Sequence, residues 1–295
     1  MTKDPATRAE RRVPKRQADH PLTHGSDEGG TASDDALRLI HLKAYAEAAR
    51  RSTGRSILDI GCNDGYGTTI LARTARQVTG VDVSPRAIKA AKARPDAGEV
   101  DFRLIDGASL PFPDSSFDLV TAFQVIEHVD DVRPFLDEIR RVTAPDGTVL
   151  FTTPNASIRL DPGMAPWNPF HVREYTAPEL EAELTSVFPS VVVRGLFAPE
   201  PLAEIELARA AAARERARHP RPMPLRLILR VLPASLKAPL RRLRRGPAGT
   251  HATRVDYSVD DLWLADDGLD LALDLHAVCS LDATELNAGA GAAGP

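Results

Sequence analysis

The residues best suited to chemistry in this chain begin with an acidic residue and a glycine-rich turn. Asp59 closes an apolar run, and Gly61 and Gly65 follow it with Asn63 between them. Glycine allows positive φ and lets a ligand approach the backbone without a Cβ in the way. Asparagine is the side-chain-bearing residue that best tolerates the same left-handed region. The turn therefore predicts a binding loop for a ligand that carries phosphate, ribose or carboxylate groups.

Apolar periodicity predicts alternating strands and helices around this turn. Strands are expected at residues 56–60, 77–81, 100–104, 117–123, 148–152, 187–197 and 269–279. Helices are expected at residues 33–51, 68–76, 85–93 and 131–142, and from residue 178 onward. This alternation is typical of a mostly parallel sheet covered on both faces, so we predict a doubly wound α/β fold.

Acidic residues fall at the ends of the first three predicted strands. Asp59 ends the first, Asp82 follows the second and Asp106 follows the third. The carboxyl ends of parallel strands form the edge at which such sheets bind ligands. A carboxylate can also accept two charge-assisted hydrogen bonds from a vicinal diol. These positions indicate a ligand site more strongly than the glycine turn does, although each aspartate could also be a helix cap or a turn residue.

The chain resembles the class I S-adenosylmethionine-dependent methyltransferases, in particular type 11/12-like small-molecule enzymes. The similarity extends over residues 35–195, in order, and rests on the stretches 58–65, 80–85, 106–112, 116–120, 125–129 and 144–147. Asn63 stands where the family loop has its second glycine. The resemblance implies S-adenosylmethionine as the cofactor and a seven-stranded Rossmann-like sheet completed by an antiparallel strand.

The resemblance also assigns roles at the cofactor. The loop should contact the methionine half, Asp82 the ribose hydroxyls and Asp106 the adenine amino group, with Val83 packed on the adenine. The residues expected to bind the cofactor are Asp59, Gly61, Cys62, Asn63, Gly65, Asp82, Val83, Asp106, Gly107, Ala108 and Gln124.

An NAD-dependent dehydrogenase is the main competing interpretation, because it combines a glycine loop with a later acidic residue. Its loop binds a diphosphate. In this chain Asp59 and Asp64 flank the loop. Negative charge at these positions disfavours a diphosphate and suits a sulfonium with an ammonium group, so the charge favours the methyltransferase.

Methyl transfer depends mainly on alignment of the nucleophile, and an oxygen nucleophile also needs a group that takes its proton. The catalytic candidates are Glu127 and His128, which follow the fourth strand, and His171, which lies beyond a proline-rich loop. Three interpretations stay open. His171 is a general base; or Gln124, Glu127, His128 and His171 bind a divalent metal, as resemblance to metal-dependent O-methyltransferases implies; or these residues only pack and anchor a loop.

The chain divides into five segments by composition. We expect a disordered tail at 1–33, the methyltransferase core at 34–198, a basic helical insertion at 199–250, a return to the core at 251–286 and a flexible tail at 287–295. Residues 209–245 hold twelve Lys and Arg residues and one acidic residue, Glu215, and a helix is expected at 200–218. This insertion could be a substrate lid, a contact with an anionic membrane or a nucleic-acid patch, but it lacks aromatic residues for base stacking.

Composition and charge indicate where in the cell the protein is expected to act. The 295 residues carry a net charge of −4 and two distant cysteines, Cys62 and Cys279, so we expect a cytoplasmic protein without a disulfide framework, with peripheral membrane contact as an alternative. No run reaches the roughly 18 apolar residues of a membrane span. We therefore predict O-methylation of a small, lipid-linked or sugar-containing acceptor. The alternative is a non-catalytic S-adenosylmethionine-binding protein whose basic insertion mediates interactions.

Overall fold

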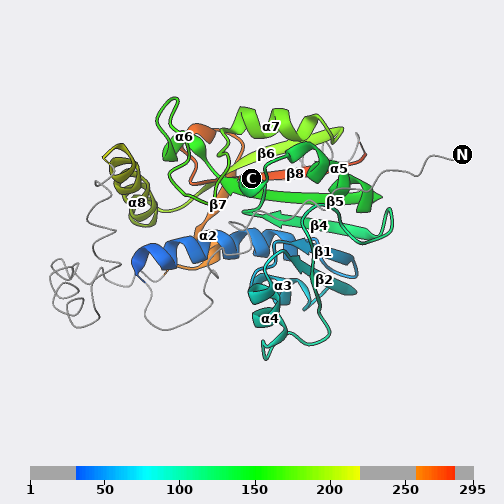
Figure 1. Ribbon diagram of the computed structural model, residues 1–295. Helices are drawn as coiled ribbons and strands as arrows, with labels where there is room; N and C mark the ends of the chain where they lie inside the picture. Colours follow the sequence, from blue (N-terminus) through cyan, green and yellow to red (C-terminus); the bar gives the residue numbers. More distant parts are fainter. Residues whose placement is uncertain (1–30, 220–256, 283–295) are drawn as a thin grey trace, which may run out of the picture.

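One sheet of eight strands organises the protein, in the order β3-β2-β1-β4-β5-β8-β6-β7. The computed structural model describes residues 31–219 and 257–282 (Figure 1). The strands are β1 (Ser56–Ile60), β2 (Gln77–Asp82), β3 (Asp101–Leu104), β4 (Phe117–Phe123), β5 (Thr143–Pro154), β6 (Ser190–Phe197), β7 (Trp263–Ala265) and β8 (Asp274–Ser280). Strands β1 to β5 pair in parallel, whereas β8, β6 and β7 are added by antiparallel pairing.

Helices cover both faces of this sheet, as predicted (Figure 1). They are α2 (Ala32–Ala49), α3 (Tyr66–Leu71), α4 (Pro85–Lys92), α5 (Val132–Val142), α6 (Ala156–Arg159), α7 (Ala177–Thr185) and α8 (Glu200–Arg218). Neighbouring residues of β1 show why two faces form. Ile57 packs in the core under α2 and α3, and Leu58 packs in the core under α5 and α7. The period-two alternation of strand side chains divides the apolar residues between the two layers.

The predicted α/β fold is confirmed, but the sheet has eight strands where seven were expected. The additional strand, β7, pairs with β6 at the edge of the sheet and spans only Trp263–Ala265. Three residues are too short to give a periodic pattern in the sequence.

Several element boundaries differ from the prediction, and four of the differences show local bonding. Helix α3 ends at Leu71, and the N–H groups of residues 73 and 74 bond to the carbonyls three positions back in place of four. The sixth strand starts at Ser190 because the N–H groups of residues 187 and 188 bond back to Leu184. Residues 269–271 form a short 3-10 helix, η3 (Leu269–Leu271), so β8 begins later than predicted. Strand β5 is longer than predicted because a bulge opposite β4 lets residues 143–147 join the ladder.

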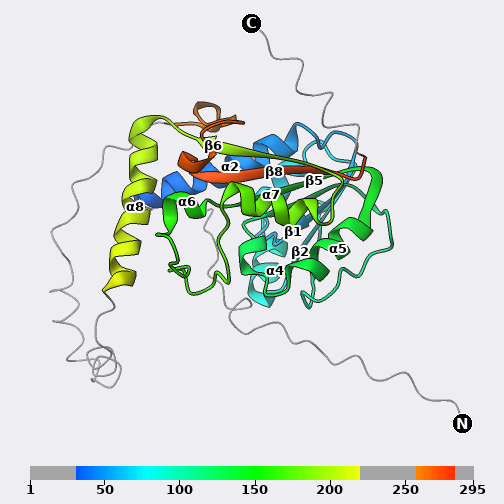
Figure 2. The same ribbon diagram turned by 90° about the horizontal axis from the view of Figure 1, so that it is seen from above.

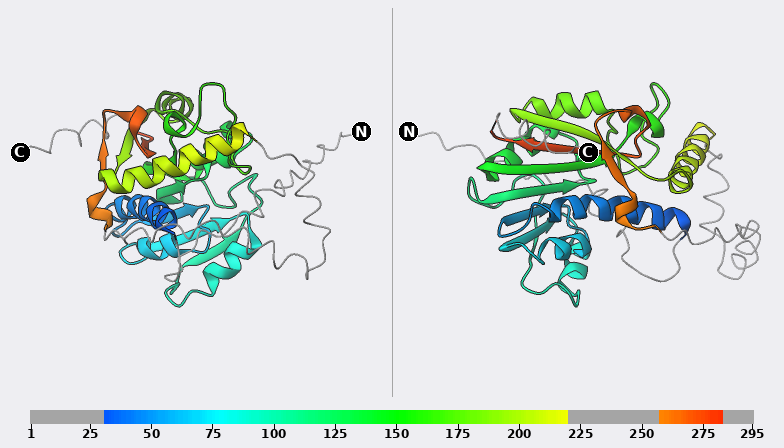
Figure 3. Two further views of the ribbon diagram at one scale, coloured as in Figure 1. Left: turned by 90° about the vertical axis from the view of Figure 1, so that its left-hand side faces the viewer. Right: turned by 180° about the vertical axis from the view of Figure 1, so that it is seen from behind.

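Helix α8 confirms the helix predicted at residues 200–218 and lies beside α2 and α6 (Figures 2 and 3). The remainder of the basic insertion, residues 220–250, lies outside the described residues, as do residues 251–256 of the predicted return to the core and most of the two predicted tails. None of the helices in the described ranges is long and apolar enough to cross a membrane. Cys62 and Cys279 are both buried and free, and Cys279 lies in β8 as expected.

Candidate cofactor and acceptor site

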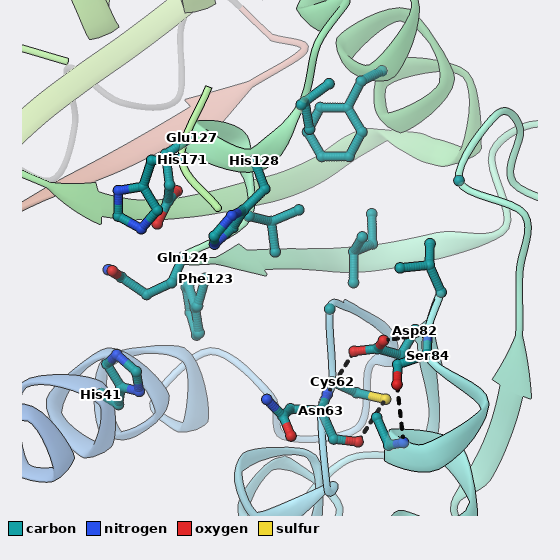
Figure 4. A pocket seen from close by; sticks show the side chains of 18 of the residues that line it. His41, Cys62, Asn63, Asp82, Ser84, Phe123, Gln124, Glu127, His128 and His171 are labelled. Carbon is teal, nitrogen blue, oxygen red and sulfur yellow. Dashed lines mark hydrogen bonds between the residues drawn. The ribbon is translucent and has the colours of Figure 1, made fainter. Parts of the chain in front are cut away.

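A cavity of about 310 Å³ lies at the carboxyl ends of the parallel strands (Figure 4). Loops after β1, β2, β3 and β4 line one part of it, and α2, α8 and the segment after β5 line the other. Eleven of the fourteen predicted site residues line this cavity: Gly61, Cys62, Asn63, Asp82, Val83, Gly107, Ala108, Gln124, Glu127, His128 and His171. Asp59, Gly65 and Asp106 do not line it.

The loop after β1 adopts the left-handed conformations that its sequence predicted. Gly61, Asn63 and Gly65 have φ of 72°, 50° and 79°. A Cβ on Gly61 would lie 2.5 Å from Cγ2 of Val125, so this position has room only for glycine. The N–H groups of Gly61 and Cys62 both donate to the Val81 carbonyl, which fastens the loop to β2.

Asp82 holds the loop and the start of α4 from the same carboxylate. Its Oδ2 accepts the Asn63 N–H at 3.0 Å, and its Oδ1 accepts the Ser84 N–H at 2.8 Å (Figure 4). Each carboxylate oxygen can accept more than one hydrogen bond. Because Asp82 also lines the cavity, its position agrees with the predicted bonding of a diol.

Asn63 supplies an acceptor that no described group satisfies. Its Oδ1 is buried and has no hydrogen-bond partner within the described residues, and the residue lines the cavity. A buried carbonyl oxygen without a donor is costly, so a ligand with an N–H group would be favoured here. The ammonium group of a methionine moiety offers such a donor, and the cavity therefore fits S-adenosylmethionine.

Asp59 lies beneath the loop instead of facing the cavity. Its carboxylate is fully buried and accepts hydrogen bonds from the hydroxyls of Thr68, Thr121 and Tyr45, at 2.6, 2.7 and 3.3 Å. Burial raises the pKa of Asp59 to about 6, against the lowering effect of these bonds. The residue joins α2, α3 and β4 below the loop.

Asp106 organises its own turn. Its carboxylate accepts the N–H groups of Ala108 at 2.9 Å and Ser109 at 3.3 Å. The turn carries Gly107 and Ala108 into the cavity wall while the Asp106 side chain stays outside it. In this structure Asp106 is therefore a turn residue, which was the alternative to direct contact with the adenine.

Glu127, His128 and His171 lie together at the edge of the cavity, although His171 is far from the other two in sequence (Figure 4). One ligand atom from each of the three lies within 4.8 Å of the others, and the two imidazole rings are 4.8 Å apart. Glu127 lies in the short helix η1 (Ile126–His128), and its Oε2 accepts the Thr153 hydroxyl at 3.1 Å. Burial raises the pKa of Glu127 to about 7.

Both histidines are held by groups of the segment after β5. Nδ1 of His128 lies 3.0 Å from the Phe170 carbonyl, and burial lowers the pKa of His128. Nδ1 of His171 lies 2.7 Å from Oε1 of Glu174, and its Nε2 lies 2.7 Å from the Asn168 amide. The His128 pKa and its carbonyl contact indicate a neutral ring with the proton on Nδ1.

Of the four residues predicted to bind a metal, the structure brings three together. The fourth, Gln124, points its amide toward β8. Its Nε2 donates to Asp274 at 2.9 Å and to the Thr152 hydroxyl at 3.2 Å. Glu127 Oε1 is buried without a partner among the described residues, as a metal ligand could be. His171, however, can offer a ring nitrogen to a cation only by giving up Asn168 or Glu174. The residues therefore fit a divalent cation only in part.

The sequence did not single out the wall opposite the cofactor loop, apart from the loop that contains Trp167. Arg159 is paired with Glu174 at 2.8 Å and lies over the Trp167 ring, 4.2 Å from its centroid. Arg209 of α8 lies 5.4 Å from the same ring and is paired with Glu206. Both arginines line the cavity, and both are neutralised by buried carboxylates.

Helix α2 completes this wall with Leu37, His41 and Tyr45. Burial lowers the pKa of His41 to about 4, so the ring is neutral at physiological pH. The sequence places these three residues on one face of the predicted helix, but it does not show that this face lines a cavity. Its side chains reach the cavity only because α2 crosses the carboxyl ends of the strands.

Three of the four arginines of α8, namely Arg209, Arg214 and Arg218, contact the segment after β5. Arg218 is bonded to Asp161 at 2.9 Å, and Arg214 lies 3.9 Å from the same carboxylate. Together with Arg209, they hold α8 against the segment after β5. This arrangement favours the lid interpretation for the described part of the insertion.

Comparisons with known proteins agree with this site. Residues 58–151 match a family model described as a methyltransferase domain. A Mycolicibacterium smegmatis protein, described as a probable S-adenosylmethionine-dependent methyltransferase, is 39% identical over 188 residues, which are 63% of this chain and 72% of that protein. The mitochondrial ubiquinone biosynthesis O-methyltransferase of Schizosaccharomyces pombe is 37% identical over 136 residues, covering 41% of this chain and 48% of the relative.

A solved structure shows the same fold. It is described as an S-adenosylmethionine-dependent methyltransferase, possible histamine N-methyltransferase, from Thermotoga maritima, and it has a TM-score of 0.53 at 13% identity. The match covers 84% of this chain and 91% of that one. The fold, the loop that fits the cofactor and the similarity to the M. smegmatis protein lead to one conclusion. The chain belongs to the S-adenosylmethionine-dependent methyltransferases.

Proposed function

We propose that this methyltransferase transfers the methyl group to a hydroxyl oxygen of a small or lipid-linked acceptor by direct in-line attack, with His171 taking the hydroxyl proton. The observation that carries the proposal is the cluster of His171, His128 and Glu127 beside the cofactor loop. S-adenosylmethionine supplies a methyl group that is already activated, so an unprotonated amine can attack it without a base. A hydroxyl needs proton removal, and a histidine at the cavity can provide it.

The opposite wall favours an acceptor without net charge. Arg159 and Arg209 carry two positive charges, and Glu174 and Glu206 balance them. His41 is neutral, and the remaining wall includes apolar and aromatic side chains such as Trp167. An anionic acceptor would have to compete with buried carboxylates for the guanidinium groups. The S. pombe relative, named as acting in ubiquinone biosynthesis, supports oxygen as the methylated atom.

The test uses the full chain, methyl-labelled S-adenosylmethionine and a panel of phenols, sugars, lipid-linked sugars and amines. We expect label on a hydroxyl oxygen, and a loss of about 10²- to 10⁴-fold in His171→Ala, as for removal of a general base. Affinity for S-adenosylhomocysteine should stay unchanged. His219→Ala is the matched control, because His219 is exposed at the end of α8. Transfer to nitrogen or carbon, or a His171→Ala variant with full rate, would refute the proposal.

The same assay separates the remaining interpretations. Loss of activity with a strong chelator, restored by Mg²⁺ or Mn²⁺ and sensitive to Glu127→Gln, would favour the metal site over the base. Binding of S-adenosylmethionine without label transfer to any extract component would favour the non-catalytic binding protein. Salt-sensitive cosedimentation of the full chain with anionic vesicles would support membrane contact through residues 209–245. Absence of cosedimentation at low salt would exclude that contact.

A further inference from the structure

Glu174 joins the candidate base to the acceptor wall. It immediately precedes Tyr175 in the segment after β5, and its side chain is fully buried. Its Oε1 lies 2.7 Å from Nδ1 of His171 and accepts Nη2 of Arg159 at 3.0 Å. Its Oε2 accepts Nε of Arg159 at 2.8 Å. The residue was not among the candidates from the sequence.

The contacts of Asn168 show which nitrogen of His171 carries the proton in this structure. The Asn168 Oδ1 accepts the Phe170 N–H at 3.1 Å, which orients the amide. Its Nδ2 therefore faces His171 Nε2, at 2.7 Å. An amide nitrogen can only donate, so Nε2 of His171 must be the acceptor, and the ring proton of the neutral form lies on Nδ1.

The proton on Nδ1 needs an acceptor, and Glu174 provides an ionised one. Burial by itself would raise the pKa of Glu174, but hydrogen bonds from His171 and Arg159 outweigh burial and lower it. The other charged or titratable groups at the ring are Glu127 and His128 from η1. The carboxylate that bonds to the ring is Glu174, at 2.7 Å from Nδ1.

We infer that Glu174 is a positioning residue that holds His171 as the Nδ1–H tautomer. In this tautomer the unprotonated Nε2 faces the cavity and accepts a hydrogen bond from the Asn168 amide. The hydroxyl group of a bound methyl acceptor would donate to Nε2 in the same way. The role of Nε2 toward a hydroxyl rests on the proposed function, whereas the tautomer does not. His171 and Asn168 both line the cavity. When the methyl acceptor binds, its hydroxyl group would replace the Asn168 amide as the hydrogen-bond donor to Nε2.

The experiment is ¹⁵N NMR of the full chain with labelled histidine, at a pH above 8 where imidazole is ordinarily neutral. The chain has eight histidines, and the His171 signals are assigned by their loss in His171→Gln. The wild-type ring should show a protonated Nδ1 and an unprotonated Nε2. In Glu174→Gln, Arg159 should bond to the amide oxygen and leave the amide N–H₂ facing Nδ1. The ring proton should then move to Nε2, or the two nitrogen signals should average.

Further variants distinguish positioning from simple structural support. Glu174→Asp, which keeps the charge, should restore the Nδ1–H signature at least in part. Glu206→Gln removes the other carboxylate near Arg159, 3.8 Å away, and should leave the His171 signals unchanged. The double variant Arg159→Met/Glu174→Gln removes both buried charges. It should lose the signature while still binding S-adenosylhomocysteine, which shows that the protein remains folded.

Two results would overturn the inference. One is an unchanged Nδ1–H signature in Glu174→Gln. The other is a signature that is lost in Asn168→Ala but kept in Glu174→Gln, which would assign the role to Asn168. The NMR measurement needs no acceptor, so it can fail while methylation at oxygen is confirmed. It can equally succeed if the transfer proves to be at another atom.

Discussion

Replacing Glu127 by Gln should stabilise the protein at alkaline pH and have little effect in acid. The Glu127 side chain is 1% exposed, and burial raises its pKa from 4.5 to about 7. In the unfolded chain the carboxyl ionises near pH 4.5, whereas in the folded protein it stays protonated up to about pH 7. Between pH 4.5 and about 7 the carboxyl is therefore ionised in the unfolded chain and protonated in the folded protein. Folding must take up a proton in this range, so the free energy of unfolding falls as pH rises.

The size of the effect follows from the shift. A shift of about 2.5 pH units at 1.36 kcal/mol each gives a loss of about 3 kcal/mol in the free energy of unfolding above pH 7. Glutamine keeps the shape of the side chain and cannot ionise, so Glu127→Gln avoids this loss. Relative to wild type, its advantage should grow by about 3 kcal/mol between pH 4.5 and pH 8. In melting temperature this amounts to roughly 5–10 °C.

The assay is thermal unfolding of the full chain and the variant, in chelator, across pH 4.5 to 8.5. Glu179→Gln is the control with the opposite sign. Hydrogen bonds from the Thr176 backbone and hydroxyl lower the pKa of Glu179, so ionisation of this carboxylate stabilises the fold. That variant should be less stable than wild type already at pH 4.5, and the difference should stay nearly constant as pH rises further, because the stabilisation develops between the lowered folded pKa and the unfolded pKa of 4.5. A difference between wild type and Glu127→Gln that does not change with pH would refute the reasoning. If a divalent cation binds Glu127, adding Mg²⁺ at pH 8 should instead stabilise wild type alone.

Three further predictions concern the cofactor loop. Asp82→Asn should lower the affinity for S-adenosylhomocysteine by at least tenfold in calorimetry, because charge-assisted hydrogen bonds contribute about 1.5–3 kcal/mol each; unchanged affinity would contradict the role of this carboxylate. Gly61→Ala should weaken the binding of S-adenosylhomocysteine and reduce the free energy of unfolding by more than about 1 kcal/mol, because the new Cβ would meet Val125. A fully active variant would show that the loop accommodates this Cβ. In urea unfolding, Asn63→Val should cost about 1–3 kcal/mol at a φ of 50° and Asn63→Gly far less, and equal losses would rule out backbone conformation as the reason for asparagine.

The sequence was most informative where one short segment determines both the conformation and the contacts. Gly61 and Asn63 were recognised from the turn itself, and their positive φ values follow from it. Asp82 was recognised from its place after a strand, which is enough to bring it to the cavity. These features depend on residues that are neighbours in the chain, so their pattern is visible without the fold.

Features that depend on distant partners could not be predicted in this way. Asp59 looked like a cavity residue, but Thr68, Thr121 and Tyr45 offer three hydroxyl donors below the loop, and the carboxylate faces them. Glu174 had no distinguishing pattern, because its role appears only when His171 and Arg159 meet at its side chain. The cavity wall from α8 likewise depends on the packing of that helix against α2 and α6.

A chain of contacts between buried charged side chains runs from α8 to the candidate base. Glu206 on α8 lies near Arg159, Arg159 is bonded to Glu174, and Glu174 is bonded to His171. Arg209 on the same helix lies over Trp167 at the cavity. A displacement of α8 that widens the acceptor entrance would take Glu206 away from Arg159 but leave the hydrogen bonds between Arg159, Glu174 and His171 in place. Opening of the entrance and alignment of the histidine are therefore separable, and the helix can move to admit an acceptor without releasing the base.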